Sequence, residues 1–166
     1  MSSRHRYAHT RRHSIHSSVD PIQLEVLVRD TAAEPVIIND LADAGLLAFE
    51  LFSIGMTVGA LVLLDERRNV VAVLLDPPLG IDEMLRWAHE PGLRAEFHQV
   101  LGILARDRII EAPPADQDIV AYREAQEMCL ALGVLWLDLL VTSSHALQSI
   151  GIVCDPDSVW NDPVEF

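Results

Sequence analysis

Three carboxylates lie close together in the sequence, at Asp107, Glu111 and Asp118. Carboxylate oxygens without imidazole partners are the ligands that hard cations such as Mg²⁺, Mn²⁺ and Ca²⁺ prefer. The spacing is therefore compatible with a site for such a cation that uses these side chains. A structural interpretation stays open beside it, because Asp116 and Asp118 fall at the predicted start of a helix. An acid in that first turn is favoured by the helix dipole by roughly 0.3–1 kcal/mol.

Two arginines, Arg106 and Arg108, flank Asp107 at alternate positions, so on a strand they would share one face. Such a pair would suit a clamp for a carboxylate or another anion, because guanidinium groups form bidentate hydrogen bonds. The other interpretation is a solvated edge paired with nearby acids. The sequence contains no GxGxxG, P-loop, HExxH or GxSxG pattern, so the common nucleotide-binding and hydrolase motifs are absent.

The elements that must position these residues follow from apolar periodicity and turn residues. The predicted order is a possible short strand at 24–28, a helix from Asn39 or Asp40 to about Ile54, strands at 58–64 and 70–75, a short helix at 82–90, a strand at 97–104, a long helix at 117–132, and strands at 134–141 and 146–153. Strands interleaved with helices predict a single three-layer α/β sandwich, a mixed sheet with flanking helices, over residues 21–154.

Charge is distributed unevenly along the chain. Residues 1–18 hold four arginines and no acid, which gives this segment a charge of +4. The net charge of the whole chain is −13, so the remaining residues carry −17. We expect residues 1–20 to be a disordered Arg/His-rich tail and residues 155–166 to be an acidic tail. Two alternatives for the first tail are an arm that binds nucleic acid or an acidic partner, and a histidine-lined metal site. The acidic body should repel nucleic acid elsewhere.

Composition limits the class of protein. Half of the 166 residues are hydrophobic, which excludes disorder across the whole chain. The longest apolar runs, 58–64 and 70–75, are far too short to span a bilayer. The two cysteines, Cys129 and Cys154, form no CxxC pair, a usage that suits a reducing compartment. We therefore expect a cytoplasmic protein without a structural zinc cluster.

The segment 102–141 carries the most specific pattern in the chain. Its characteristic residues are Pro113, Asp118–Ile119, Leu132–Val134, Leu137–Asp138 and Leu140–Val141. In this order, after a buried strand, they resemble the signature segment of RadC-type JAB/MPN metal-hydrolase domains. The resemblance covers about residues 58–152 and implies a JAB/MPN architecture, which is similar to that of cytidine deaminases.

The resemblance also implies where metal chemistry would be placed. In that family two histidines and an aspartate hold zinc, a glutamate takes the proton of the bound water, and a serine helps to stabilise the oxyanion. The matching positions here are Ala105 and Asp107 for the histidines, Asp118 for the aspartate, Ala115 for the serine, and Val73 or Leu74 for the glutamate. Asp118 alone keeps the residue type of the family, so four of the five functional positions are replaced.

We therefore expect a catalytically inactive RadC/JAB-like domain without metal or cofactor, acting as a protein-binding or assembly module. The partner would be another protein or a second copy of the chain, engaged for example through an exposed strand edge. The vestigial pocket would contain Arg106, Asp107, Arg108, Glu111 and Asp118. Two alternatives stay open: a hydrolase with a rebuilt Mg²⁺ or Mn²⁺ site, and a nucleic-acid-associated RadC relative that binds through residues 1–18.

Overall fold

The computed structural model describes residues 9–16, 21–28, 35–76, 97–109, 113–155 and 157–161, with the first two ranges and residue 161 as backbone only. The predicted helix at 82–90 and the end of the acidic tail lie outside these residues. Within the described part of the chain, no helix is long and apolar enough to cross a membrane.

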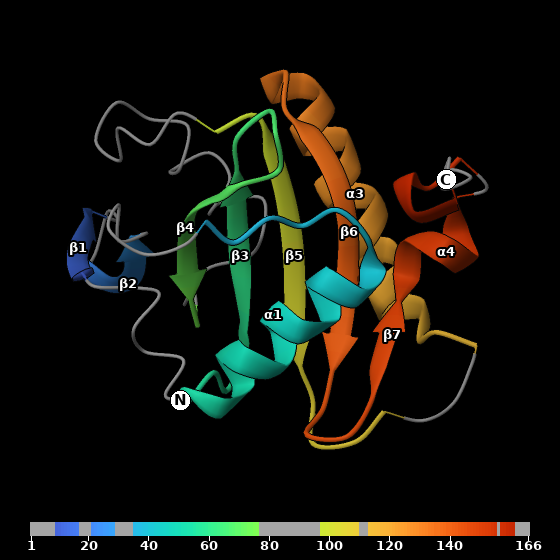
Figure 1. Ribbon diagram of the computed structural model, residues 1–166, viewed down its shortest axis with the longest axis horizontal. Helices are drawn as coiled ribbons and strands as arrows, with labels where there is room; N and C mark the ends of the chain where they lie inside the picture. Colours follow the sequence, from blue (N-terminus) through green and yellow to red (C-terminus); the bar gives the residue numbers. More distant parts are fainter. Residues whose placement is uncertain are drawn as a thin grey trace.

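One sheet forms the centre of the molecule. Its strands are β1 (His9–His16), β2 (Pro21–Val28), β3 (Gly59–Leu64), β4 (Val70–Leu75), β5 (Gln99–Ala105), β6 (Leu135–Thr142) and β7 (Leu147–Ser149). They are arranged in the order β1-β2-β4-β3-β5-β6-β7 (Figure 1). Neighbouring strands are antiparallel except β5 and β6, which run parallel. The predicted α/β class and mixed sheet are confirmed.

Strands β3 and β4 form the predicted hairpin around a polar turn. The carboxylate of Asp65 accepts the backbone N–H groups of Arg67 and Asn69, both at 2.9 Å. Arg68 adopts the left-handed conformation with φ of 63°. Side chains of β3 and β4 are buried on both faces of the sheet, apart from a half-buried Val71. Burial on both faces explains why each strand reads as an uninterrupted apolar run.

The far end of this hairpin is held by Asp76, directly after β4. Its carboxylate accepts the backbone N–H groups of Thr57, Val58 and Gly59 at 2.9, 2.7 and 3.1 Å. Asp76 has a φ of 46°, a left-handed conformation that costs an L-residue roughly 1–2 kcal/mol. The hydrogen bonds offset that cost and join the start of β3 to the end of β4.

Two longer helices begin and end as their sequences predict. In α1 (Leu41–Ser53) the N-cap Asp40 accepts the N–H of Asp43 at 2.9 Å, which satisfies one of the free donors of the first turn. Helix α3 (Asp116–Leu132) ends at Gly133, whose φ of 73° gives a left-handed C-cap. The helices predicted at 39–54 and 117–132 are therefore confirmed.

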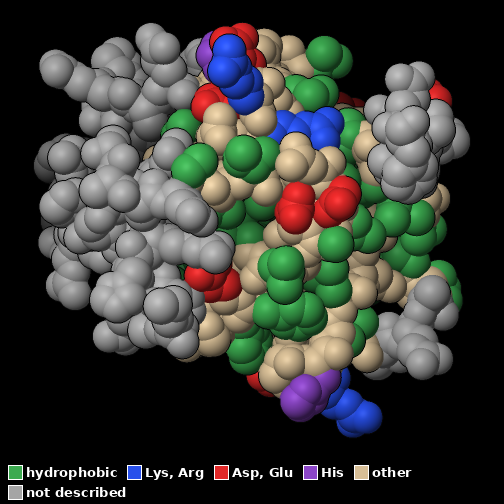
Figure 2. All heavy atoms as spheres, viewed as in Figure 1, with side chains coloured by type: hydrophobic (Ala, Val, Ile, Leu, Met, Phe, Trp, Pro, Cys, Tyr) green, Lys and Arg blue, Asp and Glu red, His purple; other side chains and the backbone are tan. Residues whose placement is uncertain are grey.

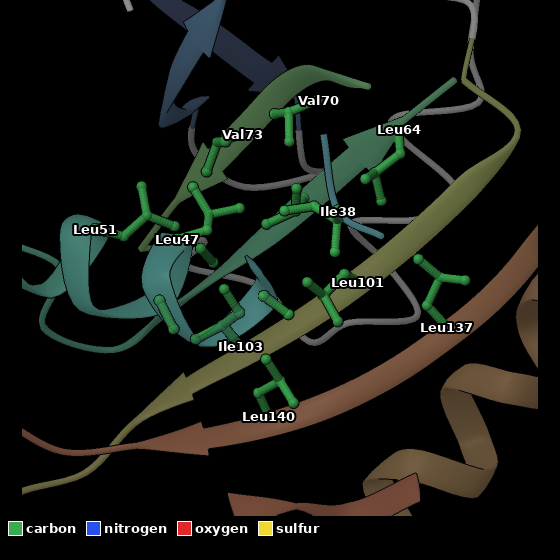
Figure 3. Packing of buried hydrophobic residues seen from close by; sticks show 14 of the residues in the cluster. Ile38, Leu47, Leu51, Leu64, Val70, Val73, Leu101, Ile103, Leu137 and Leu140 are labelled. Atoms are coloured by element: carbon green, nitrogen blue, oxygen red, sulfur yellow. The ribbon is translucent and has the colours of Figure 1, made fainter. Parts of the chain in front are cut away.

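The helices cover opposite faces of the sheet, which gives three layers (Figure 1). On one face Leu47 and Leu51 of α1 pack with the sheet residues Val62, Ile103 and Leu140, part of the cluster in Figure 3. The residues that alternate with these along the strands point to the other face. There α3 and α4 (Ile150–Cys154) contribute Tyr122, Ala125, Cys129 and Ile150, and the sheet contributes Leu61, Leu63, Leu74 and Leu139.

The end of the domain differs from the prediction of a strand at 146–153. Strand β7 stops at Ser149, and the chain continues as the short helix α4. Two side chains start this helix. The Ser149 hydroxyl accepts the N–H of Ile152 at 3.2 Å, and the carboxylate of Asp138 accepts the N–H of Gly151 at 2.7 Å. The apolar run Ile150–Val153 thus becomes a helix through a local N-cap and through one contact, from Asp138, that is distant in sequence.

The first residues also differ from the expectation, because strand β1 lies within the predicted tail 1–20. It pairs with β2 along its whole length, from His9 opposite Val28 to His16 opposite Pro21. Strand β2, which contains the predicted short strand 24–28, pairs in turn with β4. Backbone pairing needs no apolar pattern in β1 itself, so the Arg/His-rich composition gave no signal for this strand.

Candidate functional site

The best-positioned polar residues lie where the parallel strands β5 and β6 end and α3 begins. Ala105, the last residue of β5, pairs with Thr142, the last residue of β6. The N–H of Arg106 then donates to the carbonyl oxygen of Thr142 at 2.8 Å. The carboxyl ends of parallel strands are where open α/β sheets commonly bind ligands. This end of the sheet is therefore the candidate site.

An ion pair between Arg106 and Asp118 occupies the candidate site. A guanidinium N–H of Arg106 donates to the carboxylate of Asp118. The Asp118 side chain is 6% exposed and that of Arg106 is 33% exposed, so the carboxylate is buried and the guanidinium is partly open to solvent. Asp118 lies in the first turn of α3, where the helix dipole also favours its negative charge.

The remaining residues of the predicted pocket are not all brought together. Strand β5 ends at Ala105, so Arg106 and Arg108 lie in the following loop and do not share a strand face. Asp107 and Arg108 are exposed, whereas Arg106 turns toward Asp118. Glu111 lies outside the described residues. Within the described ranges, no three His, Cys, Asp or Glu side chains are grouped so that they could hold a metal ion.

The positions that match the hydrolase residues have other roles in the fold. Ala115 is the N-cap of α3 and provides no side-chain hydrogen bond to it. Val73 and Leu74 are completely buried and belong to the clusters on opposite faces of the sheet. Leu74 is the one on the face covered by α3. The side chains at these positions offer no group that would activate water or stabilise an oxyanion.

The turn between β6 and β7 contains Ser143 and His145, two residue types that are common in nucleophilic catalysis. The Ser143 hydroxyl accepts the backbone N–H groups of His145 and Ala146 at 3.3 and 3.1 Å. These contacts form a Ser-based turn, and the imidazole of His145 takes no part in them. Ser143 therefore closes the turn.

A second polar cluster surrounds Asp138 in β6, a residue that the sequence indicates only as part of the family pattern. Asp138 is completely buried. Its carboxylate accepts the indole N–H of Trp160 at 2.6 Å, the N–H groups of Leu139 and Gly151 at 2.7 Å each, and the hydroxyl of Ser149. A charged residue inside a run of buried apolar residues, LWLDLLVT, was the available signal, because buried acids need partners.

Burial raises the pKa of Asp138 above its usual value, while the hydrogen bonds from Ser149, Gly151, Trp160 and Leu139 lower it in part. The pKa of Tyr122 is raised as well, mainly by burial and then by the nearby negative charges of Asp155 and Asp138. Both effects have the same origin. This cluster is a desolvated region in which additional negative charge is unfavourable.

The raised pKa of Asp138 predicts how its contribution to stability depends on pH. At pH values between the pKa of Asp138 in the unfolded state, near 3.8, and its higher pKa in the folded state, the folded protein binds the proton more readily than the unfolded protein does. Stability from this group is therefore present below this pH range and is lost as pH rises through it. We expect the free energy of unfolding of the wild type, minus that of Asp138→Asn, to fall as pH increases above about 4.

This difference is measured by urea unfolding of both proteins at several pH values. Subtracting the variant removes the contribution of the other acidic residues. A difference that rises with pH would mean that the hydrogen bonds outweigh burial and that the folded pKa is lowered.

Comparisons with known proteins found no match for this chain among family models, curated proteins or solved structures. The geometry of the candidate site therefore carries the functional argument.

Proposed function

We propose that this chain is a catalytically inactive RadC/JAB-like domain that works as a protein-binding or assembly module. The observation that carries the proposal is the ion pair of Arg106 with Asp118. Asp118 matches the one metal-ligand position that keeps its residue type. Its carboxylate is buried and already neutralised by a guanidinium from its own chain.

The charge at this position explains how the fold would persist without metal. A buried carboxylate that lost a bound cation would remain uncompensated, at a cost of several kcal/mol. Arg106 supplies a positive charge at the same carboxylate, so the domain keeps its local electrostatics without an ion. The start of α3 at Asp116, and its packing beside β5 and β6, agree with the element order that the resemblance implies.

The competing hypothesis is a hydrolase with a rebuilt site for Mg²⁺ or Mn²⁺. Such a site would need the carboxylate of Asp118 as a ligand, and a cation there would have to displace Arg106. Binding of an ion to the folded state raises stability by mass action, by about 2.7 kcal/mol when the ion is present at about 100 times its dissociation constant. The two hypotheses therefore differ in the response of the melting temperature to added metal.

The test measures the metal content of the purified full chain by mass spectrometry, and its melting temperature with Mg²⁺, Mn²⁺ or Zn²⁺ at millimolar concentration. We expect substoichiometric metal and no shift for the wild type. Asp118→Asn is the matched control, because it removes the charge and keeps the shape. Stoichiometric metal that is lost in Asp118→Asn, or a melting temperature that rises with an ion only when Asp118 is present, would overturn the proposal.

A further inference from the structure

The outward side of helix α1 is apolar, although its inward side already covers the sheet. Ala44, Leu47 and Leu51 are buried against the sheet. Leu46 is 69% exposed and Phe49 is 37% exposed. Together with exposed Ala42 and Ser53 they recur at the spacing of one helix face. We name these four residues the α1 stripe; Figure 2 shows hydrophobic side chains gathered on this side of the molecule, over α1.

The charged residues of α1 itself are acidic, and among the described residues the basic side chain beside its first turn is Arg68, whose guanidinium donates to the carbonyl oxygen of Asn39. Asp43 and Glu50 are the charged residues of α1, Asp40 caps the helix, and its last turn contains no basic residue. The chain outside residues 1–18 carries a net charge of −17. A partner with acidic residues beside its apolar surface would be repelled here, whereas one with Lys or Arg would be attracted.

We propose that the α1 stripe binds an amphipathic helix of another protein, whose apolar face is flanked by Lys and Arg. This inference rests on the proposed role as a binding module and assigns its surface and its class of partner. The apolar face would pack on Leu46 and Phe49, and the basic residues would lie beside Asp40 and Asp43 at the start of α1. Two helices pack by placing the side-chain ridges of one in the grooves of the other, so a single exposed helix is sufficient as a platform.

Charge also decides between the possible occupants. A second copy of this chain, packed α1 against α1, would bring two acidic helices together in molecules that each carry a net charge of −13. Nucleic acids and anionic membranes are polyanions and meet the same repulsion. A basic amphipathic helix offers both an apolar face and opposite charge. Phe49 is the expected anchor, because buried aromatic residues carry much of the binding energy at interfaces.

The test uses a fluorescein-labelled peptide about five turns long, with leucines on one face and lysines on the rest, and a matched peptide with glutamate in place of each lysine. Binding to the full chain is measured by fluorescence anisotropy at about 0.15 M salt, where long-range attraction is largely screened. We expect the lysine peptide to bind and the glutamate peptide to bind at least about tenfold more weakly.

The surface is assigned by a double variant and a matched control. Leu46→Ser with Phe49→Ser should weaken binding of the lysine peptide by at least about tenfold. Leu130→Ser on α3, at a position that is 80% exposed, should leave binding unchanged. Melting temperatures of both variants check that they fold. Equal binding of the lysine peptide to the wild type and to the folded double variant would overturn the proposal, and so would its failure to bind the wild type.

Size-exclusion chromatography with light scattering supplies the last comparison. A wild-type dimer that the double variant converts to monomer would show that a second copy occupies the α1 stripe, which also overturns the proposal. Failure here is distinguishable from failure of the proposed function. Stoichiometric metal that depends on Asp118 would contradict the proposed function, whether or not the peptide binds. If the protein is metal-free and the peptide does not bind, only the assignment of the α1 stripe as the binding surface is wrong.

Discussion

Replacing Asp138 with alanine is expected to lower the free energy of unfolding by about 3–5 kcal/mol, the cost of breaking a buried charged network. The side chain is completely buried, and the variant would leave the donors of Ser149, Gly151, Leu139 and Trp160 without their acceptor. Each buried donor without a partner costs about 1–3 kcal/mol. Urea unfolding followed by circular dichroism measures the change, with the slope of the transition as a check on two-state behaviour.

Two variants separate loss of the carboxylate from general disturbance of the packing. Trp160→Phe removes one donor and keeps most of the ring, so we expect a loss of about 0.5–1.5 kcal/mol, the net value of one hydrogen bond. Ser149→Ala should cost a similar amount, with the loss of the N-cap hydrogen bond of α4 added to it. If Asp138→Ala cost no more than either of these, the carboxylate would not hold the C-terminal segment to the sheet.

The second large effect is expected at the candidate site, where Arg106→Ala removes the partner of a buried carboxylate. We expect a loss of about 1–3 kcal/mol, below the range for a fully buried pair because the Arg106 side chain is 33% exposed. Arg106→Lys should recover part of the loss, since lysine keeps the charge and lacks the planar fork of the guanidinium. Thermal and urea unfolding measure these differences.

A double-mutant cycle shows whether the loss comes from the pair. The variant Arg106→Ala with Asp118→Asn leaves no buried charge, so we expect it to be more stable than Arg106→Ala alone. The coupling energy between the two positions should then be about 0.5–3 kcal/mol, the range for residues in direct contact. A coupling energy near zero would mean that the carboxylate is stabilised by the start of α3 and that the guanidinium adds nothing.

Much of the fold could be predicted because local pattern and final structure agree. The hairpin β3–β4 was encoded by two apolar runs around Asp65–Asn69, and α3 by its acidic first turn and by Gly133. The last strand, predicted at 146–153, is present as β7 but ends earlier, at Ser149. Ile150–Val153 is as apolar as a strand, and the helix there is started by the N-cap Ser149 together with the carboxylate of Asp138, which is adjacent in space and distant in sequence.

The candidate site was predicted only in part for the same reason. Alternation suggested that Arg106 and Arg108 share a face, but β5 ends at Ala105 and the two side chains separate. The pairing of Arg106 with Asp118 spans a loop and could not be read from residue types. The apolar periodicity predicted the buried face of α1. It did not indicate a role for the exposed face, because single exposed apolar residues are common on protein surfaces.

The parallel pairing of β5 with β6 has a consequence for the kinetics of folding. Gln99 lies opposite Leu135, with the whole of α3 between them in the chain, so this pair forms only after a long loop has closed. The β3–β4 hairpin closes over a few residues and can form first. Substitutions in the Asp65 turn should therefore slow folding, whereas loss of the Trp160–Asp138 contact should mainly speed unfolding.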